Sequence, residues 1–210
     1  MNRLVVFGDS WPYGVELNQG EKTFGELLHE KLGTDQFVNY SQEGTSIEHL
    51  IIQFKNYSSV KETATDYAVF FITNPIRYMI NEDGDWNTIR PTGDKTAKTK
   101  FYYEHLQSDA LDHHRANVTV LALQNMCRTS TKVIKDIYLE GWTNINWNYP
   151  GVDQKKFVPK TALQMFEAEM NKRTKELVKY QNNPFIHPNK YHPNQKGHQL
   201  IADELYEFIK

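Results

Sequence analysis

A short turn near the start of the chain, F-G-D-S-W-P-Y-G from Phe7 to Gly14, places a serine directly after an apolar run. Ser10 in such a turn has two interpretations. Its hydroxyl caps the next helical turn, as serine often does, or it is a nucleophile. Taken by itself the turn favours the cap, because nucleophilic catalysis also needs a base, a group that orients the base, and donors for an oxyanion.

The C-terminal segment H-P-N-Q-K-G-H, which begins at His192, contains a candidate base. A histidine followed by Pro, Asn and a glycine that opens an apolar helix is expected on a loop beside the sheet edge. Ser10 follows the first predicted strand, and ligands of open α/β sheets bind outside the carboxyl ends of the strands. A neutral imidazole is suited to accept a proton from a serine hydroxyl at neutral pH, so His192 is the predicted base.

With these two segments in place, the chain resembles the SGNH, or GDSL-type, esterase and lipase family. The first block of that family, roughly G-D-S-L-T-x-G, is matched by Gly8, Asp9, Ser10 and Gly14, with Trp11 and Pro12 in place of the usual residues. The last block, D-x-x-H-P-N-x-x-G-H followed by I-A, is matched by His192, Pro193, Asn194, Gly197, His198, Ile201 and Ala202. The segments N-Y-S-Q-E-G-T-S and I-T-N-P-I-R-Y resemble the two middle blocks, whose glycine and asparagine correspond to Gly44 and Asn74.

The resemblance implies a flavodoxin-like α/β/α fold and hydrolysis of acyl esters through a Ser–His centre. Ser10 would attack the ester carbonyl, and His192 would take its proton and deliver it to the leaving alcohol. The oxyanion would be held by the backbone N–H groups of Ser10 and Gly44 and by the side-chain amide of Asn74.

The chain departs from the family at the residue that orients the histidine, because Asn189 stands where the family has Asp. An amide oxygen can accept the Nδ1–H of the imidazole, but it gives no negative charge to the imidazolium. Three alternatives follow: a working Ser–His–Asn centre, help from another carboxylate such as Asp153, or a weakened enzyme kept as a binding or structural protein. The third block also departs, with Ile72 in place of a glycine and Pro75 in place of an Asp.

Apolar runs that alternate with helical patterns organise the chain as one domain, residues 1–210, with an α/β three-layer fold and a mostly parallel sheet. Strands are expected at residues 4–7, 36–40, 67–72, 132–138 and 185–186. Helices are expected at residues 24–32, from about 46, at 101–126 with a break near 116–117, at 161–180 and at 197–209. Residues 81–100 lack periodicity and are expected to be a polar surface insertion. Residues 141–151, rich in aromatics and Asn, are expected to form a loop.

Three further residues are candidates for substrate binding. Arg77, just after Asn74, would clamp an anionic group, or it is an ordinary surface charge. Trp142 and Trp147 stand among asparagines, a composition that suits stacking on sugar rings, or they fold the loop onto the domain. The expected substrate is therefore a small-molecule acyl ester, with an acetyl group on a carbohydrate as one form.

The composition limits the partners, cellular locations and cofactors that are expected. There are 24 Lys and Arg against 26 Asp and Glu, so the net charge of -2 gives no reason to expect a nucleic-acid partner or a membrane surface. No apolar stretch reaches the roughly 18 residues of a membrane span, and the N-terminus lacks a signal-peptide layout, so a cytoplasmic location is expected. Cys127 is expected to be a buried small hydrophobe. No cofactor or metal site is predicted, and the oligomeric state is left open.

Overall fold

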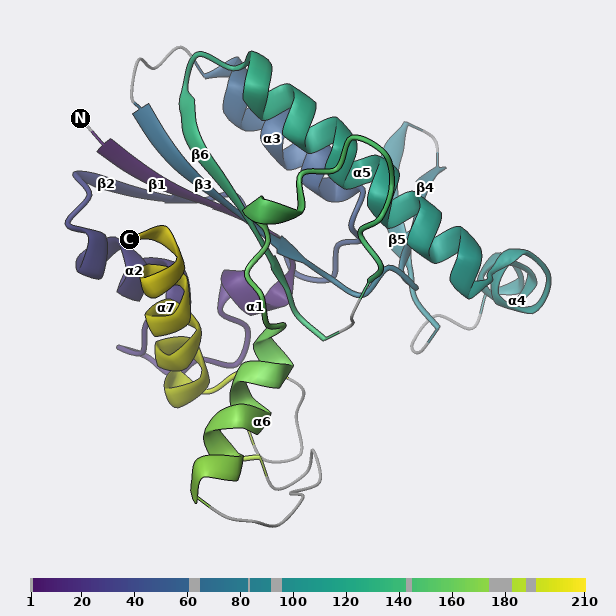
Figure 1. Cartoon of the computed structure of the whole chain (residues 1–210). Coiled ribbons are helices and arrows are strands. Elements are labelled where there is room, and N and C mark those ends of the chain that lie inside the picture. The colour runs from purple at the N-terminus through teal and green to yellow at the C-terminus, as the bar shows by residue number, and fades with distance from the viewer. Residues whose placement is uncertain are drawn as a thin grey trace.

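A central sheet of four parallel strands, in the order β2-β1-β3-β6, forms the middle of the computed structural model (Figure 1). The structure describes residues 2–60, 65–82, 84–91, 96–142, 145–173, 183–187 and 192–210. The strands of this sheet are β1 Asn2–Phe7, β2 Gln36–Asn39, β3 Thr65–Ile72 and β6 Val133–Glu140. The sequence prediction of a parallel α/β sheet is confirmed.

Strand β1 shows why these segments form the sheet centre. Its residues Leu4, Val5, Val6 and Phe7 are fully buried, because helices cover both faces of the strand. A parallel strand covered on both sides has a continuous apolar sequence instead of an alternating one. Because all four strands are parallel, their carboxyl ends lie at one edge, where the loops after β1, β2 and β3 meet.

Helices cover the sheet in two layers, as Figure 1 shows. On one side lie α2 Phe24–Leu32, α6 Ala162–Arg173 and α7 Gln195–Ile209, and on the other side α3 His49–Ser59 and α5 Asp109–Thr129. Each layer packs its own hydrophobic core against the sheet, one around Phe71 and Phe166 and the other around Phe70 and Phe54. The three-layer α/β/α architecture predicted from the sequence is therefore the observed one.

Local sequence determines where the helices begin and end. The first full-length helix, α2, starts with a capping box in which Thr23 Oγ1 accepts the N–H of Glu26, and the Glu26 side chain accepts the N–H of Thr23. It ends at Gly33, whose φ of 61° is the left-handed conformation that glycine adopts without strain. Both ends agree with the prediction.

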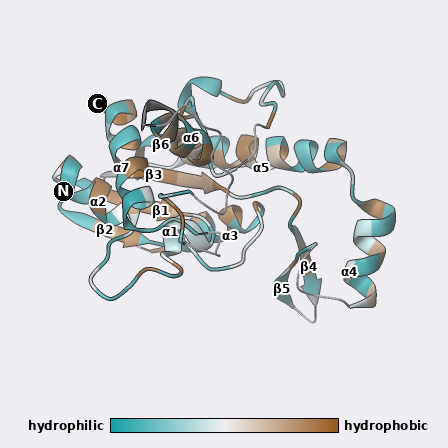
Figure 2. Ribbon diagram, turned by 90° about the horizontal axis from the view of Figure 1, so that it is seen from below, coloured by the Kyte–Doolittle hydropathy of each residue, from teal (hydrophilic) through white to brown (hydrophobic). Residues whose placement is uncertain are grey.

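The insertion after β3 differs from its prediction as an excursion without regular structure. It contains an antiparallel hairpin, β4 Tyr78–Glu82 and β5 Asp85–Ile89, followed by α4 Ala97–Phe101 and one π-helical stretch, Tyr102–Leu106. Figure 2 shows this hairpin standing apart from the main sheet. The first three residues of β5 are exposed, so it buries no face that would produce an alternating pattern.

The long helix also differs from its prediction, because the break lies before α5 and not within it. Ser108 caps α5 by accepting the N–H of Leu111 at 3.2 Å. Asn117, expected at a break, is accommodated inside the helix because its Nδ2 donates to the carbonyl oxygen of His113 at 2.8 Å. A polar residue with such a partner need not end a helix.

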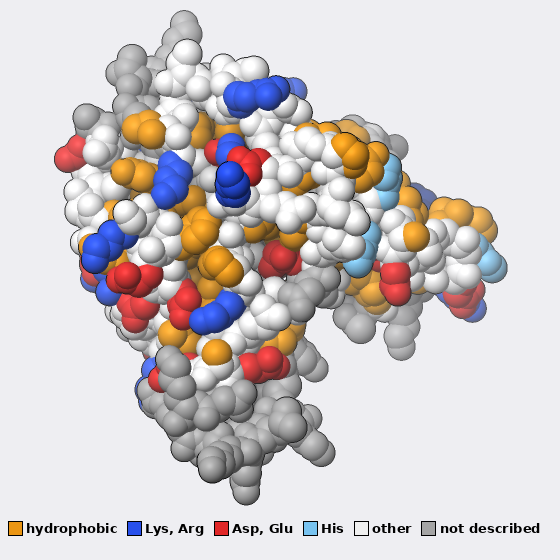
Figure 3. All heavy atoms as spheres, in the orientation of Figure 1, with side chains coloured by type: hydrophobic (Ala, Val, Ile, Leu, Met, Phe, Trp, Pro, Cys, Tyr) orange, Lys and Arg blue, Asp and Glu red, His pale blue; other side chains and the backbone are white. Residues whose placement is uncertain are grey.

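Acidic and basic side chains are intermixed on the face shown in Figure 3, without a large patch of one sign. Within the described parts of the chain, no helix is long and apolar enough to cross a membrane, and no group of three His, Cys, Asp or Glu side chains could hold a metal ion. Cys127 is buried as predicted, and burial raises the pKa of its thiol.

Candidate active site

The turn after β1 holds Ser10 at the carboxyl edge of the sheet. It leads into a single helical turn, α1 Ser10–Tyr13, whose cap is Asp9: its Oδ1 accepts the N–H of Trp11 at 3.1 Å. Ser10 is the first helical residue and does not cap the helix. The capping interpretation of Ser10 is therefore wrong, and its buried hydroxyl is available for another partner.

Gly8 allows the backbone of this turn to pack closely against Pro12 and Phe71. A Cβ at this position would lie 2.5 Å from Pro12 Cγ and 2.9 Å from Phe71 Cβ, so only glycine fits. Its backbone is tied to α3, because its N–H donates to Gln53 Oε1 at 3.0 Å and its carbonyl accepts from Gln53 Nε2 at 2.8 Å. The same carbonyl accepts the N–H of Gln42 at 3.1 Å, which fixes the loop after β2 beside the turn.

Asp9 joins the three loops at the sheet edge. Its Oδ2 accepts from Thr73 Oγ1 at 2.5 Å and from Arg77 Nη1 at 2.8 Å, and the same Nη1 donates to the carbonyl oxygen of Thr45 at 3.1 Å. Arg77 is thus neither a surface charge nor a free cation, because it forms an ion pair with a buried carboxylate. Its predicted contact with an anionic substrate stays a prediction.

His192 lies on the opposite side of Ser10, with its Nε2 3.0 Å from Ser10 Oγ. Local contacts explain the residue types in the segment that follows His192. Asn194 caps α7 by accepting the N–H groups of Lys196 and Gly197 at 3.0 and 3.1 Å. A Cβ at Gly197 would collide with the carbonyl oxygen of Phe185. These contacts fix the loop from which His192 reaches the serine, so the two predicted residues meet.

His198, six residues further on, has a structural role. It is fully buried, and its Nδ1 accepts the N–H of Phe24 at the start of α2. Burial, with smaller effects from His187 and His192, lowers the pKa of His198 to about 3. The imidazole is therefore neutral near pH 7 and joins α7 to α2 across the core.

The other nitrogen of His192 faces a carboxylate that the sequence did not indicate. Glu16 Oε2 lies 3.1 Å from His192 Nδ1. Asn189, the predicted partner, lies outside the described residues. Asp153 has a different role, because its Oδ1 accepts the N–H of Lys155 in the 3-10 turn Gln154–Lys156. No motif marks Glu16, and the one clue in the chain is a carboxylate six residues after the nucleophile.

The three predicted oxyanion donors lie in loops that the contacts above bring together. Asn74 Oδ1 accepts the N–H of Ile76 at 3.1 Å, which orients the amide and leaves Nδ2 as its donor. Gly44 has a φ of 77° in the turn after β2. Among the hydrogen bonds of the described residues, none uses the N–H of Ser10 or Gly44 or the Nδ2 of Asn74. Their part in an oxyanion hole stays a prediction.

A polar cavity of about 450 Å³ lies next to Gly44. It is bounded by the loop after β2 and by the hairpin, and its polar lining consists of Gln42, Glu43, Thr45, His49, Asn87, Thr88 and Arg90. The guanidinium of Arg90 packs on Gly44 so closely that a Cβ there would collide with its Nη2. Within the described part of the chain, Arg90 makes no hydrogen bond or ion pair. A cation with free donors therefore lines the cavity.

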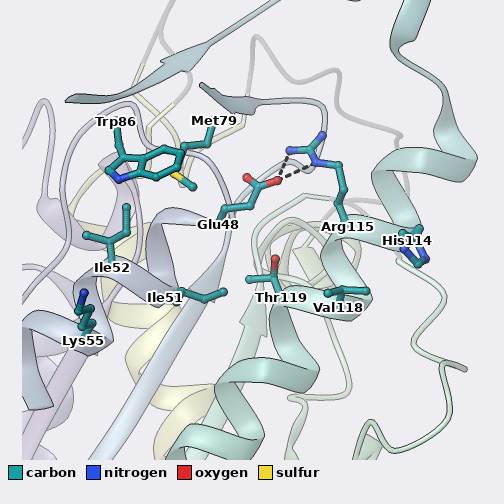
Figure 4. Close-up of a pocket in the computed structure, with 10 residues that line it drawn as sticks. All are labelled: Glu48, Ile51, Ile52, Lys55, Met79, Trp86, His114, Arg115, Val118 and Thr119. Carbon is teal, nitrogen blue, oxygen red and sulfur yellow. Dashed lines mark hydrogen bonds and ion pairs between the residues drawn. The ribbon is translucent and has the colours of Figure 1, made fainter. Parts of the chain in front are cut away.

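A second cavity, of about 550 Å³, lies behind these loops between α3, α5 and the hairpin (Figure 4). Its lining is mostly apolar, and Trp86 borders both cavities. At its edge Arg115 pairs with Glu48 and donates to the carbonyl oxygen of Arg77 at 2.9 Å. This partly buried arginine thus supports the turn that carries Asn74.

The two tryptophans of the loop at 141–151 fold onto the domain. Trp142 packs against Trp11, with 5.1 Å between ring centroids. Trp147 is 8% exposed, its Nε1 donates to Glu140 Oε1 at 2.7 Å, and its ring packs on Phe157. This arrangement agrees with the second interpretation of the loop and leaves little of the Trp147 ring for a sugar.

Comparison with known proteins supports the fold. No protein-family model matches the sequence, and no curated protein matches it. TesA aligns with 99% of this chain and 98% of its own, at 13% identity and a TM-score of 0.61. A lipolytic protein of the G-D-S-L family from Veillonella parvula aligns with 99% of this chain and 97% of its own, at 15% identity and a TM-score of 0.54. An acetyl xylan esterase from Geobacillus stearothermophilus aligns with 99% of this chain and 94% of its own, at 15% identity and a TM-score of 0.55. The chain has the fold of the G-D-S-L lipolytic proteins, as the resemblance implied.

Proposed function

We propose that this chain is a serine hydrolase of the SGNH type that cleaves small acyl esters. The observation that supports this proposal most directly is the 3.0 Å separation between Ser10 Oγ and His192 Nε2. That distance lies within the hydrogen-bond reach that a nucleophile and its base require. The two residues come from opposite ends of the chain, and a shared fold with solved lipolytic proteins is consistent with their pairing.

The reaction would proceed in two halves. Ser10 Oγ attacks the ester carbonyl carbon while His192 Nε2 takes the hydroxyl proton, and the carbonyl electron pair moves onto its oxygen. The tetrahedral intermediate collapses, the alcohol leaves with the proton from Nε2, and the acyl group remains on Ser10. Water then attacks the acyl-enzyme with the same proton transfers, which releases the acid and restores the hydroxyl of Ser10.

The developing negative charge would be stabilised by the three donors that have no other hydrogen bond in the described structure. These are the N–H groups of Ser10 and Gly44 and the Nδ2 of Asn74. A donor that is already oriented and unpaired gives its full strength to the transition state. Removal of one such donor typically costs about 3 kcal/mol of transition-state stabilisation.

For the substrate, we propose an acyl ester on a carbohydrate. The cavity beside Gly44 supports this choice because it is polar and presents amide, hydroxyl and guanidinium groups that hydrogen-bond to sugar hydroxyls. Trp86 at its border is 52% exposed, and an exposed indole is suited to stack on a sugar ring. The fold is shared with a protein described as an acetyl xylan esterase. Trp86 thus takes the role that the sequence had suggested for Trp142 and Trp147.

The experiment combines p-nitrophenyl acetate turnover with labelling by a fluorophosphonate probe. We expect turnover and labelling of the native chain, and a loss of at least about 10⁴-fold in kcat, with no labelling, in Ser10→Ala. Ser46→Ala is the matched control, because Ser46 is also buried and its Oγ also contacts an imidazole, that of His49, at 3.2 Å. Its activity should stay within about threefold of the native value. Absence of turnover and labelling in the native chain would contradict the proposal.

The alternative is a binding or structural protein that keeps the fold without efficient catalysis. It was suggested by the missing Asp at Asn189. The same variants separate the two functions, because glycan binding without hydrolysis, unchanged in Ser10→Ala, would favour the binding protein. The main argument for a binding protein is the absence of a carboxylate at position 189, and the carboxylate of Glu16 beside His192 weakens that argument.

A further inference from the structure

We infer that Glu16 positions His192, in the place of the Asp that the SGNH family has where this chain has Asn189. The inference rests on the proposed function, since it concerns the same Ser–His centre. It assigns Glu16 as a positioning residue: its carboxylate acts on the ester only through the imidazole. The carboxylate would then come from the loop after the nucleophile instead of from the loop before the histidine.

The geometry at His192 carries the inference. Ser10 Oγ is 3.0 Å from Nε2, and Glu16 Oε2 is 3.1 Å from Nδ1, so the serine and the carboxylate lie beside different nitrogens of one ring. For Nε2 to accept the serine proton it must be unprotonated, which places the proton of the neutral ring on Nδ1. A carboxylate at Nδ1 favours this tautomer, and it also stabilises the imidazolium that forms during attack.

Burial increases the effect of this charge. The side chains of Glu16 and His192 are each 21% exposed, so water reaches them only partly and screens the pair less than on an open surface. An amide at the same place would orient the ring without a charge. Glu16 therefore supplies the negative charge that the amide of Asn189 lacks.

The backbone of the loop holds Glu16 in an unusual conformation. Glu16 has a φ of 73°, and among the described residues it is the single non-glycine residue with a positive φ. Such a conformation is unfavourable for a residue other than glycine, and it persists only where neighbouring contacts enforce it. Strain of this kind often occurs where a side chain must be aimed at a functional group.

The contacts that enforce this conformation come from the nucleophile turn itself. The N–H groups of Gly14 and Val15 both donate to the carbonyl oxygen of Ser10 at 3.1 Å, and the N–H of Leu17 donates to the carbonyl of Gly14 at 3.2 Å. Gly14 is left-handed, with a φ of 90°. Ser10 and Glu16 are therefore the two ends of one hydrogen-bonded element, and His192 contacts both ends.

Steady-state kinetics of Glu16→Gln tests the inference, because Gln keeps the shape and removes the charge. We expect kcat on p-nitrophenyl acetate to fall by at least about 100-fold with KM changed by less than about threefold, since substrate contacts remain. Glu21→Gln is the matched control. Glu21 is a carboxylate of the same loop region that accepts the N–H of Asn18 at 2.7 Å. This control should retain native kinetics, and thermal unfolding should show that both variants fold.

Rescue distinguishes positioning from a merely structural role. In Glu16→Gln/Asn189→Asp the carboxylate returns to the position that the family uses, and we expect kcat to recover at least about tenfold over Glu16→Gln alone. A kcat of Glu16→Gln within threefold of the native value would overturn the inference, as would a large loss in Asn189→Ala with none in Glu16→Gln. If Ser10→Ala retains activity, it is the proposed function that fails. If Ser10→Ala and His192→Ala are inactive while Glu16→Gln is normal, only the role of Glu16 fails.

Discussion

The turn that carries Ser10 and the hairpin β4–β5 both adjoin the loop after β2, yet they are built in opposite ways. In the turn, the N–H and the carbonyl of Gly8 are both hydrogen-bonded, both carboxylate oxygens of Asp9 accept hydrogen bonds, and Ser10 is 4% exposed. Trp86 in the hairpin is half exposed, and Arg90, the residue after β5, has no hydrogen bond or ion pair to another described residue. One element is fixed by the core, and the other presents free groups to the solvent.

This difference corresponds to two tasks. In the proposed reaction, proton transfer between Ser10 and His192 would require atoms held within about 0.5 Å, which a buried turn with many hydrogen bonds can provide. Recognition of a substrate needs exposed groups that gain hydrogen bonds only when the ligand arrives. Changes in the turn should therefore lower stability and kcat together, whereas changes in the hairpin should raise KM and leave stability nearly unchanged.

Asp9→Asn should produce the largest stability effect. Asn can still cap α1, but it leaves Arg77 without its carboxylate in a position where the guanidinium is only 18% exposed. Removal of one partner of a buried ion pair costs about 3 kcal/mol. We expect a loss of this size in the free energy of unfolding, measured by urea titration, together with a lower kcat because the turn loses its link to β3.

Asp85→Asn is the control for that variant, because Asp85 begins β5 on the exposed hairpin. It should change the free energy of unfolding by no more than about 0.5 kcal/mol. Equal losses in the free energy of unfolding of Asp9→Asn and Asp85→Asn would contradict the proposed difference between the turn and the hairpin.

His198 extends the fixed region, and its effect depends on pH. Its pKa is about 3 in the folded chain, below the value of about 6.5 expected when unfolded. Below pH 6.5 the unfolded chain therefore binds a proton that the folded chain does not, so the stability present above pH 6.5 is lost as the pH falls towards 3. For this one group the loss is on the order of 1 kcal/mol per pH unit between pH 6 and 4.

His198→Asn should make the stability of the chain less sensitive to acid. The amide oxygen of Asn can accept the N–H of Phe24 in place of Nδ1, and it does not titrate. His105→Asn, at a histidine that is 58% exposed, is the control and should leave the pH profile of the native chain intact. Profiles of His198→Asn and the native chain that run parallel from pH 7 to 4 would contradict the assigned role of His198.

The fixed region is also the part that the sequence predicted best. Strand β1 is an unbroken apolar run, and Gly8, Asn194 and Gly197 each have a single steric or capping reason that leaves a recognisable pattern. Ser10 and His192 could be paired because both lie at such constrained positions. Burial and close approach restrict the residue type, and restricted positions produce motifs.

The features that the sequence missed are those with weaker restrictions. The hairpin buries little of β5, so its residues show no period. Glu16 is selected by the shape of a loop with a positive φ, which no spacing rule describes. The sequence left open whether Trp147 stacks on a sugar or folds onto the domain, because it does not show that Glu140, at the end of β6, accepts the Nε1–H of this residue. Long-range contacts of this kind depend on the assembled fold.

The smallest expected effect concerns Arg90, the residue after β5. Arg90→Ala removes the unpaired guanidinium from the cavity beside Gly44. We expect KM for a mono-O-acetylated disaccharide to rise about tenfold, the loss of one hydrogen bond to a charged group, with kcat nearly unchanged. Hydrolysis of p-nitrophenyl acetate, which has no sugar, should be unaffected. Lys55→Ala, at an exposed cation of the apolar cavity in Figure 4, should alter neither substrate. A fall in kcat for both substrates in Arg90→Ala would instead place Arg90 with the reacting atoms, and the hairpin would then belong to the catalytic machinery.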